Sequence, residues 1–163
     1  MLAINRLTVR SKLTKEELLR SVKFSVDDGE TFGLIGESGS GKSMTSKCIM
    51  RLLNSRAFQI QGEIRWKGRD VFSMNAKELA DYRGKQISMI PQNPMTAFAP
   101  MVKLGKQLEM GFQFSSKEER HNFSRKLTNT LASVNLSDAE KIFNSYPDEL
   151  SGGILQRVMI ALT

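Results

Sequence analysis

A glycine-rich stretch with one lysine offers the clearest chemistry in the sequence. It consists of Gly36, Glu37, Ser38, Gly39, Ser40, Gly41, Lys42 and Ser43, and it fits the pattern G-x-x-x-x-G-K-[ST]. Glycines let the backbone wrap a polyphosphate with its N–H groups pointing inward, where side chains would crowd the anion. Lys42 would supply a positive charge for the β- and γ-phosphates, and Ser43 a hydroxyl for Mg²⁺. The stretch therefore predicts a phosphate loop that binds a nucleotide.

The segments on either side of this loop have the character that a phosphate loop requires. Residues 31–35 form a short apolar run after an acidic turn at 27–30, and they predict a buried strand. After the loop, Met44, Ile49 and Leu52 recur at helical spacing. The start of that helix adds roughly half a positive charge from its aligned peptide dipoles. Strand, loop and helix in this order favour a nucleotide site over a chance glycine-rich turn.

The remaining N-terminal half predicts mostly β structure. Alternating apolar residues predict strands at 2–9 and 22–26, with a polar connection between them that has room for a helical turn. Residues 61–71 alternate around a turn at Lys67 and Gly68, which predicts a hairpin. Asn75 begins a short helix with capping-box spacing, and residues 87–90 predict a further strand.

The second half predicts helices. Serines at 115 and 116 begin a helix whose apolar face includes Phe123, Leu127 and Leu131. Residues 137–140 begin another, with Ile142, Phe143 and Tyr146 expected on its inner side. These apolar faces are interpreted as core packing. His121 has no second metal ligand nearby and is interpreted as a surface residue.

Length, charge and composition limit the kinds of protein that the sequence can encode. The chain has 163 residues, a formal charge of +7 and one cysteine, Cys48, which fits a cytosolic protein without a disulfide framework. No signal peptide and no membrane-spanning run are visible. Lysines and arginines are scattered, so a basic solvated surface is favoured over a nucleic-acid interface.

A second anion-binding pattern lies near the end of the chain. Ser151, Gly152 and Gly153 precede an apolar helix, and they combine a hydroxyl, free N–H groups and a positive dipole end. Two such helix starts in one domain have two explanations. Either the helical segment folds back over the loop to reach the same phosphate, or each start completes a site on a partner chain.

At this point the chain resembles the ATP-binding subunits of ABC transporters over essentially its whole length. The phosphate loop resembles their Walker A motif, Gln92 their Q-loop glutamine, and residues 150–157 their LSGGQ signature, with Ile154 where many members carry Gln. The resemblance implies an α/β fold, a P-loop NTPase of the ABC ATPase type. Its N-terminal part would be antiparallel β, and a helical subdomain would carry the signature. The expected domains are a nucleotide-binding core at 1–94 and a helical subdomain at 95–163.

The resemblance also implies roles and partners. ATP would lie between the Walker A motif of one subunit and the signature of a second ATPase subunit paired head to tail. Lys42 and Ser43 would bind ATP and Mg²⁺, while Ser151 and Gly153 would contact the γ-phosphate held by the other subunit. Gln92 would approach Mg²⁺ and the attacking water, as a catalytic residue. The subunit would hydrolyse ATP at the cytoplasmic face of the cell membrane, bound to transmembrane permease subunits and indirectly to a substrate-binding protein.

A finer resemblance concerns the cargo. Residues 91–100, 105–108 and 146–149 are similar to the peptide/nickel branch of importers, and the residues around Gln92 and at 152–157 to its nickel-type member. Import of nickel or a related metal chelate is therefore expected, with di- or oligopeptide import as the alternative. An ABC ATPase acting on nucleic acid and an inactive remnant that regulates a partner are the other functions considered.

Two features depart from the family pattern. The sequence ends at Thr163, before the hydrophobic strand ending in Asp, the catalytic Glu and the later histidine of the family. We therefore expect a truncated product with an incomplete sheet and an exposed apolar edge, inactive in ATP turnover by itself. The residues near Arg10 also lack the aromatic side chain on which the family stacks adenine, and Arg10 is the candidate to stack instead.

Overall fold

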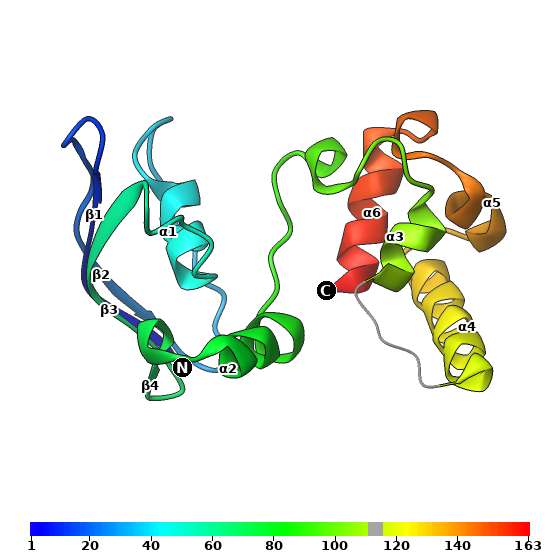
Figure 1. Cartoon of the computed structure of the whole chain (residues 1–163), viewed down its shortest axis with the longest axis horizontal. Coiled ribbons are helices and arrows are strands. Elements are labelled where there is room, and N and C mark those ends of the chain that lie inside the picture. The colour runs from blue at the N-terminus through cyan, green and yellow to red at the C-terminus, as the bar shows by residue number, and fades with distance from the viewer. Residues whose placement is uncertain (111–115) are drawn as a thin grey trace. The chain divides into compact units, whose positions relative to one another are not determined.

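The computed structural model describes the chain except for residues 111–115 (Figure 1). The chain divides into two compact units, Met1–Ser88 and Met89–Thr163. This boundary lies slightly before the one expected from the sequence, between residues 94 and 95. The phosphate loop belongs to the first unit, and Gln92 and the signature belong to the second.

The first unit is built on a four-stranded antiparallel sheet. Its strands are β1 (Leu2–Ser11), β2 (Glu17–Val26), β3 (Phe58–Trp66) and β4 (Arg69–Asp70), in the order β2-β1-β3-β4. The strands predicted at 2–9 and 22–26 are confirmed. The second strand begins at Glu17, so the connection contains a tight turn at 12–14 instead of a helical turn.

The predicted hairpin at Lys67 and Gly68 is confirmed as the link between β3 and β4. Both turn residues have positive φ, 48° and 80°, as in the two-residue turns that match strand twist. The strands pair through Arg65 with Asp70 and through Trp66 with Arg69.

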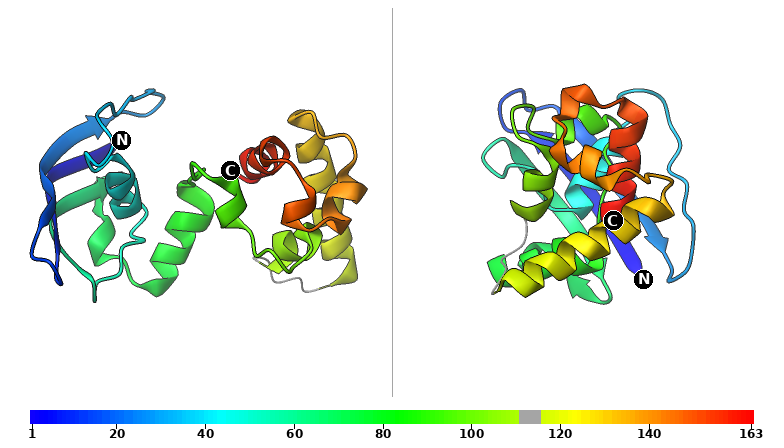
Figure 2. Two further views of the ribbon diagram at one scale, coloured as in Figure 1. Left: turned by 90° about the horizontal axis from the view of Figure 1, so that it is seen from above. Right: turned by 90° about the vertical axis from the view of Figure 1, so that its right-hand side faces the viewer.

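Helix α1 (Lys42–Ile49) lies against one face of this sheet (Figures 1 and 2). Cys48 on its inner side is fully buried with Leu7, Val9 and Ile64 of the sheet, so the thiol is part of the core. The unit ends with a 3-10 turn (Val71–Ser73), α2 (Ala76–Asp81) and a π-helical turn (Tyr82–Gln86).

Two predicted strands are absent. Residues 31–35 and 87–90 are assigned no strand, and the first segment is exposed throughout, with Ile35 at 96%. A strand needs a neighbour that completes its ladder of hydrogen bonds, and neither segment has one among the described residues. Phe32 is held instead by stacking on Phe24, with ring centroids 4.7 Å apart. The apolar residues at 31–35 favour burial, but they do not indicate whether a neighbouring strand is present to pair with.

The second unit is helical. It contains a 3-10 turn (Pro94–Ala97), α3 (Leu104–Met110), α4 (Lys117–Ser133), α5 (Ala139–Asn144), a second 3-10 turn (Pro147–Glu149) and α6 (Gly152–Leu162). Its core is one apolar cluster to which α3, α4, α5 and α6 contribute.

Most sequence predictions for this unit hold. Leu127, Leu131 and Ile142 are buried as expected, whereas Tyr146 is 38% exposed instead of facing inward. Tyr146 lies two residues after the last residue of α5, where the chain is no longer helical. Its side chain therefore does not continue the inner face of that helix. The N-cap Ser116 accepts a hydrogen bond from Glu119 N at 3.1 Å; the alternative cap at position 115 lies outside the described residues. No helix in the described part of the chain is long and apolar enough to cross a membrane.

Candidate nucleotide site

The phosphate loop closes around the ammonium group of its own lysine. Lys42 Nζ donates hydrogen bonds to Gly36 O at 2.7 Å, to Glu37 O at 2.6 Å and to Ser40 Oγ at 3.3 Å. Residues 31–40 are all exposed. The ammonium group of Lys42 is thus held in an exposed loop by hydrogen-bond acceptors, and a bound anion can take the place of these acceptors.

Helix α1 begins directly at this loop. Gly41 is its N-cap, and the oxygen of Gly41 accepts from both the N and the Oγ1 of Thr45, at 2.8 and 3.0 Å. The first N–H groups of a helix have no partner inside the helix and carry its positive dipole end. The first turn of α1 contains no acidic residue. The exposed hydroxyl of Ser43 lies in this turn.

Gly41 also fixes the loop against the sheet. Its φ of 95° is in the left-handed region, which favours glycine. A Cβ at this position would lie 2.2 Å from Leu19 Cδ2 and 3.3 Å from Leu18 O. Strand β2 therefore packs directly against the start of α1, and this contact was not anticipated from the sequence.

These residues fit a polyphosphate ligand. An ammonium group, the start of a helix and a glycine-rich backbone are the donors that phosphate oxygens require. No group of three or more His, Cys, Asp or Glu side chains in the described residues could hold a metal ion. In this loop, Ser43 is the residue whose side-chain oxygen could contact a Mg²⁺ ion that accompanied the phosphates, together with phosphate oxygens and water.

The interior behind the loop is apolar enough to suppress ionisation. Burial raises the pKa of the Cys48 thiol to about 11. Burial also raises the pKa of Tyr82 to about 12, against a smaller opposite effect of the Arg83 charge. Both groups therefore stay protonated at neutral pH.

The second anion-binding pattern is exposed at the start of α6. Ser151 is the N-cap, and its Oγ accepts from Ile154 N at 3.4 Å. Gly152 and Gly153 are exposed, and a Cβ added to either would meet no atom within 4 Å. Leu155, one turn on, is fully buried. The helix is thus anchored in the core while its start faces outward.

Gln92 lies in an exposed segment just before the 3-10 turn at Pro94–Ala97. Its neighbour Asn93 caps that turn by accepting from Met95 N at 3.0 Å. Gln92 and Ser151 belong to one unit and Lys42 to the other. The structure therefore defines each group by itself, and the shared site predicted from the sequence stays a prediction.

Arg10, the residue considered for stacking on the base, has a different partner in the structure. Its Nη2 donates to Glu17 Oε1 at 2.6 Å across the β1–β2 hairpin. The charge is exposed and paired, and its proposed stacking role is untested.

Residues 19–163 match the family described as ABC transporter. The chain belongs to the ABC transporter family. This match covers the phosphate loop, Gln92 and the signature in one continuous region. It supports the fold class predicted from the sequence.

Relatives of this ABC transporter chain include ATP-binding proteins of two kinds of import system. CntD, the ATP-binding protein of a metal-staphylopine import system from Staphylococcus aureus, is 38% identical over 99% of this chain and 59% of its own length. The oligopeptide transport ATP-binding protein OppD from Bacillus subtilis is 40% identical over 90% of this chain and 41% of its own length. The chain thus spans about half the length of these relatives.

Solved structures confirm the fold. A dimeric structure of a bacterial ABC transporter cassette has a TM-score of 0.77 and 26% identity, covering 99% of this chain and 68% of the other. A dimeric post-hydrolysis structure of the same cassette, bound to ADP and Pi, has a TM-score of 0.76 at 25% identity. The α/β fold with an antiparallel β part and a helical part is therefore that of an ABC ATPase.

Proposed function

We propose that this chain binds ATP and couples its hydrolysis to solute import as part of an ABC transporter. The observation that carries the proposal is the exposed loop of residues 36–43, whose carbonyls hold the Lys42 ammonium group and which leads directly into α1. Family membership is consistent with it, and the dimeric relative bound to ADP and Pi has the same fold.

On binding, Lys42 would exchange its loop acceptors for phosphate oxygens. Its Nζ already lies 2.7 and 2.6 Å from two loop carbonyls, so the ammonium group needs little reorganisation to reach a phosphate in the loop. The N–H groups at the start of α1 would bind further phosphate oxygens. The hydroxyl of Ser43 would take part in holding Mg²⁺, whose charge helps to neutralise the phosphates.

The two glycines at the start of α6 support a site that is completed by a second subunit. Glycine is less favourable than alanine inside a helix by about 1 kcal/mol, yet neither Gly152 nor Gly153 has a positive φ or a crowded neighbourhood. Nothing within the described chain requires their small size. A phosphate that approached from a partner subunit would require small residues here, because its oxygens must reach backbone N–H groups without a side chain in the way.

Catalysis is assigned to the assembled site and not to the loop alone. Gln92 would orient the attacking water and contact Mg²⁺, and its exposed segment is accessible to both. The proposed partners are a second ATPase subunit, permease subunits at the cytoplasmic face of the membrane and, through them, a substrate-binding protein.

For the cargo, we propose a metal chelate, with nickel as the first ion to test. The relative from the metal-staphylopine import system matches over almost the whole of this chain. Peptide import is the second candidate, because the oligopeptide relative is as similar in identity. Transport of radiolabelled nickel chelate and of a tripeptide by the reconstituted importer would separate them, since only the true cargo is taken up in an ATP-dependent manner.

Substitution of Lys42 by Ala tests the central proposal. Loss of the ammonium group is expected to weaken ATP binding by about 10- to 100-fold, as for loss of a charged hydrogen bond. Binding of a fluorescent ATP analogue to the full chain measures this. Lys47→Ala is the matched control, because Lys47 is an exposed lysine in the last turn of the same helix. Equal ATP affinity in the Lys42 variant and the parent would overturn the assignment.

A further inference from the structure

The C-terminal end of α1 is held by two side chains from a later segment of the chain. Tyr82 Oη donates to Ile49 O at 2.9 Å. Arg83 Nε donates to Met50 O at 2.8 Å, and Arg83 Nη2 donates to Arg51 O. Three successive carbonyls at the end of the helix thus receive donors from two successive residues.

The charge of Arg83 complements this end of the helix. The last carbonyls of a helix have no partner inside it and carry its negative dipole end. Arg83 is half-buried, and it forms no ion pair with a carboxylate in the described residues. The carbonyls of Met50, the C-cap of α1, and of the next residue, Arg51, accept its hydrogen bonds, and loss of Arg83 would release this end of the helix.

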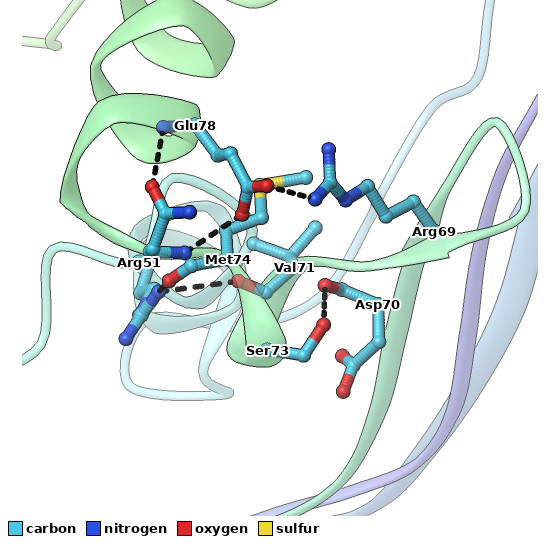
Figure 3. A network of polar contacts seen from close by, with 8 residues as sticks. Arg51, Arg69, Asp70, Val71, Ser73, Met74 and Glu78 are labelled. Carbon is cyan, nitrogen blue, oxygen red and sulfur yellow. Dashed lines mark hydrogen bonds and ion pairs between the residues drawn. The ribbon is translucent and has the colours of Figure 1, made fainter.

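A second arginine, Arg51, links the same helix end to residues 71–74. Arg51 Nη1 donates to Met74 O at 2.6 Å and to Val71 O at 3.4 Å (Figure 3). Figure 3 also shows Glu78 paired with Arg69. Glu78 completes the capping box of α2 with Asn75. The attachment of α1 to Tyr82 and Arg83 is thus separate from the surface ion pairs nearby.

The two ends of α1 have different neighbours along the chain. Its start carries the phosphate loop, and the helix is only eight residues long, so a displacement at its start would reach its far end. Tyr82 begins the π-helical turn at Tyr82–Gln86, which is closed by a bond from Ile87 N to Tyr82 O at 3.0 Å. Single π turns are frequent at functional sites. This turn runs directly into residues 87–92, which end at the predicted catalytic glutamine.

We propose that Tyr82 and Arg83 are positioning residues that couple the phosphate loop to the segment leading to Gln92. The inference rests on the proposed function. As the loop and Lys42 close on the phosphates, α1 shifts and its far end carries the Tyr82–Gln86 turn with it. Neither side chain reaches the nucleotide loop. Their loss therefore spares ATP binding and interrupts only the response of residues 82–88.

Hydrogen–deuterium exchange of the full chain, with and without Mg·ATP, tests this coupling. In the parent, ATP is expected to slow exchange about tenfold both in the loop and in residues 82–88. Arg83→Met is expected to keep ATP affinity within about threefold and to retain protection of the loop, but to lose protection of 82–88. Arg69→Met is the matched control, because it removes an exposed ion pair of the same unit without touching α1.

Two milder variants keep the test decisive if Arg83→Met folds poorly. Tyr82→Phe retains the buried ring and loses one hydrogen bond, so it should lose part of the protection of 82–88. Arg83→Lys keeps the charge without the two-pronged guanidinium and should restore part of it. Full protection of 82–88 in all three variants would overturn the coupling, as would a parent in which ATP protects only the loop. A parent whose loop shows no response to ATP would instead overturn the proposed function, and this inference with it.

Discussion

At the scale of single residues, burial decides which groups in the nucleotide unit are reactive. Cys48 is fully buried against the sheet, whereas Lys42 and Ser43, earlier in the same helix, are accessible. One helix thus presents its polar start to solvent and its thiol to the core. The alternation follows from the helical period, which places positions 42 and 43 on a different side from position 48.

The raised pKa of Cys48 predicts a loss of stability in alkali. The unfolded thiol ionises from about pH 9, whereas the folded thiol stays protonated to about pH 11. Between these values the folded state binds the extra proton, so the free energy of unfolding falls as pH rises, by about 2–3 kcal/mol in all. Urea unfolding of the parent at pH 8 to 11 measures this decline.

Cys48→Ala serves as the reference for the same series. The variant is expected to be less stable at neutral pH because it leaves a small cavity, but its stability should decline less between pH 9 and 11. Parallel declines in parent and variant would show that the thiol ionises without penalty and that Cys48 is not closed to solvent.

At the scale of elements, the phosphate loop depends on how closely β2 approaches α1. Gly41→Ala combines a left-handed φ with a Cβ 2.2 Å from Leu19 Cδ2. We expect a loss of about 2–4 kcal/mol in the free energy of unfolding, from backbone strain and overpacking together. Urea unfolding at neutral pH provides the measurement.

Gly39→Ala isolates the backbone part of that effect. Gly39 has a φ of 83°, but a Cβ there would meet no atom within 4 Å. Its replacement should lower stability by only about 1–2 kcal/mol. Equal losses at the two glycines would mean that Leu19 moves aside freely and that contact between β2 and the loop does not hold α1 in place.

Local signals allowed much of the fold to be predicted. The hairpin at Lys67 and Gly68 and the helix capped by Asn75 were recognised because their turn and capping residues act over a few positions. Residues 31–35 were misjudged as a strand because strand formation depends on a neighbour that local composition does not reveal. The contacts of Arg83 with the end of α1 were missed for the same reason, since they join residues more than thirty positions apart.

The candidate site was predictable to a different degree. The loop at 36–43 and the start of α6 were recognised by residue type and spacing, and the structure shows both exposed at the start of a helix. Their association is not a property of one compact unit. It concerns how units and subunits assemble, and spacing along one chain does not encode this.

At the scale of the whole molecule, the proposal places each nucleotide between the loop of one subunit and the signature of another. Gly153→Glu is suited to test it. A carboxylate in the first turn of α6 is stabilised by the positive end of the helix dipole, and a Cβ at this position would meet no atom within 4 Å. The fold is therefore expected to tolerate the substitution. The same carboxylate would repel a γ-phosphate. Gly153→Gln, which is nearly isosteric and uncharged, is the control.

A mixture of two defective variants gives the sharpest outcome. Each chain carrying Lys42→Ala or Gly153→Glu alone would form pairs in which both nucleotide sites are damaged. A mixed pair would concentrate both defects in one site and leave the other intact. ATP-dependent association, followed by sedimentation velocity, should therefore be weak for each variant alone and stronger for the mixture, though below that of the parent. If the mixture associates no better than its components, the loop and the signature do not share a nucleotide between subunits, because only a site shared in that way is restored by mixing.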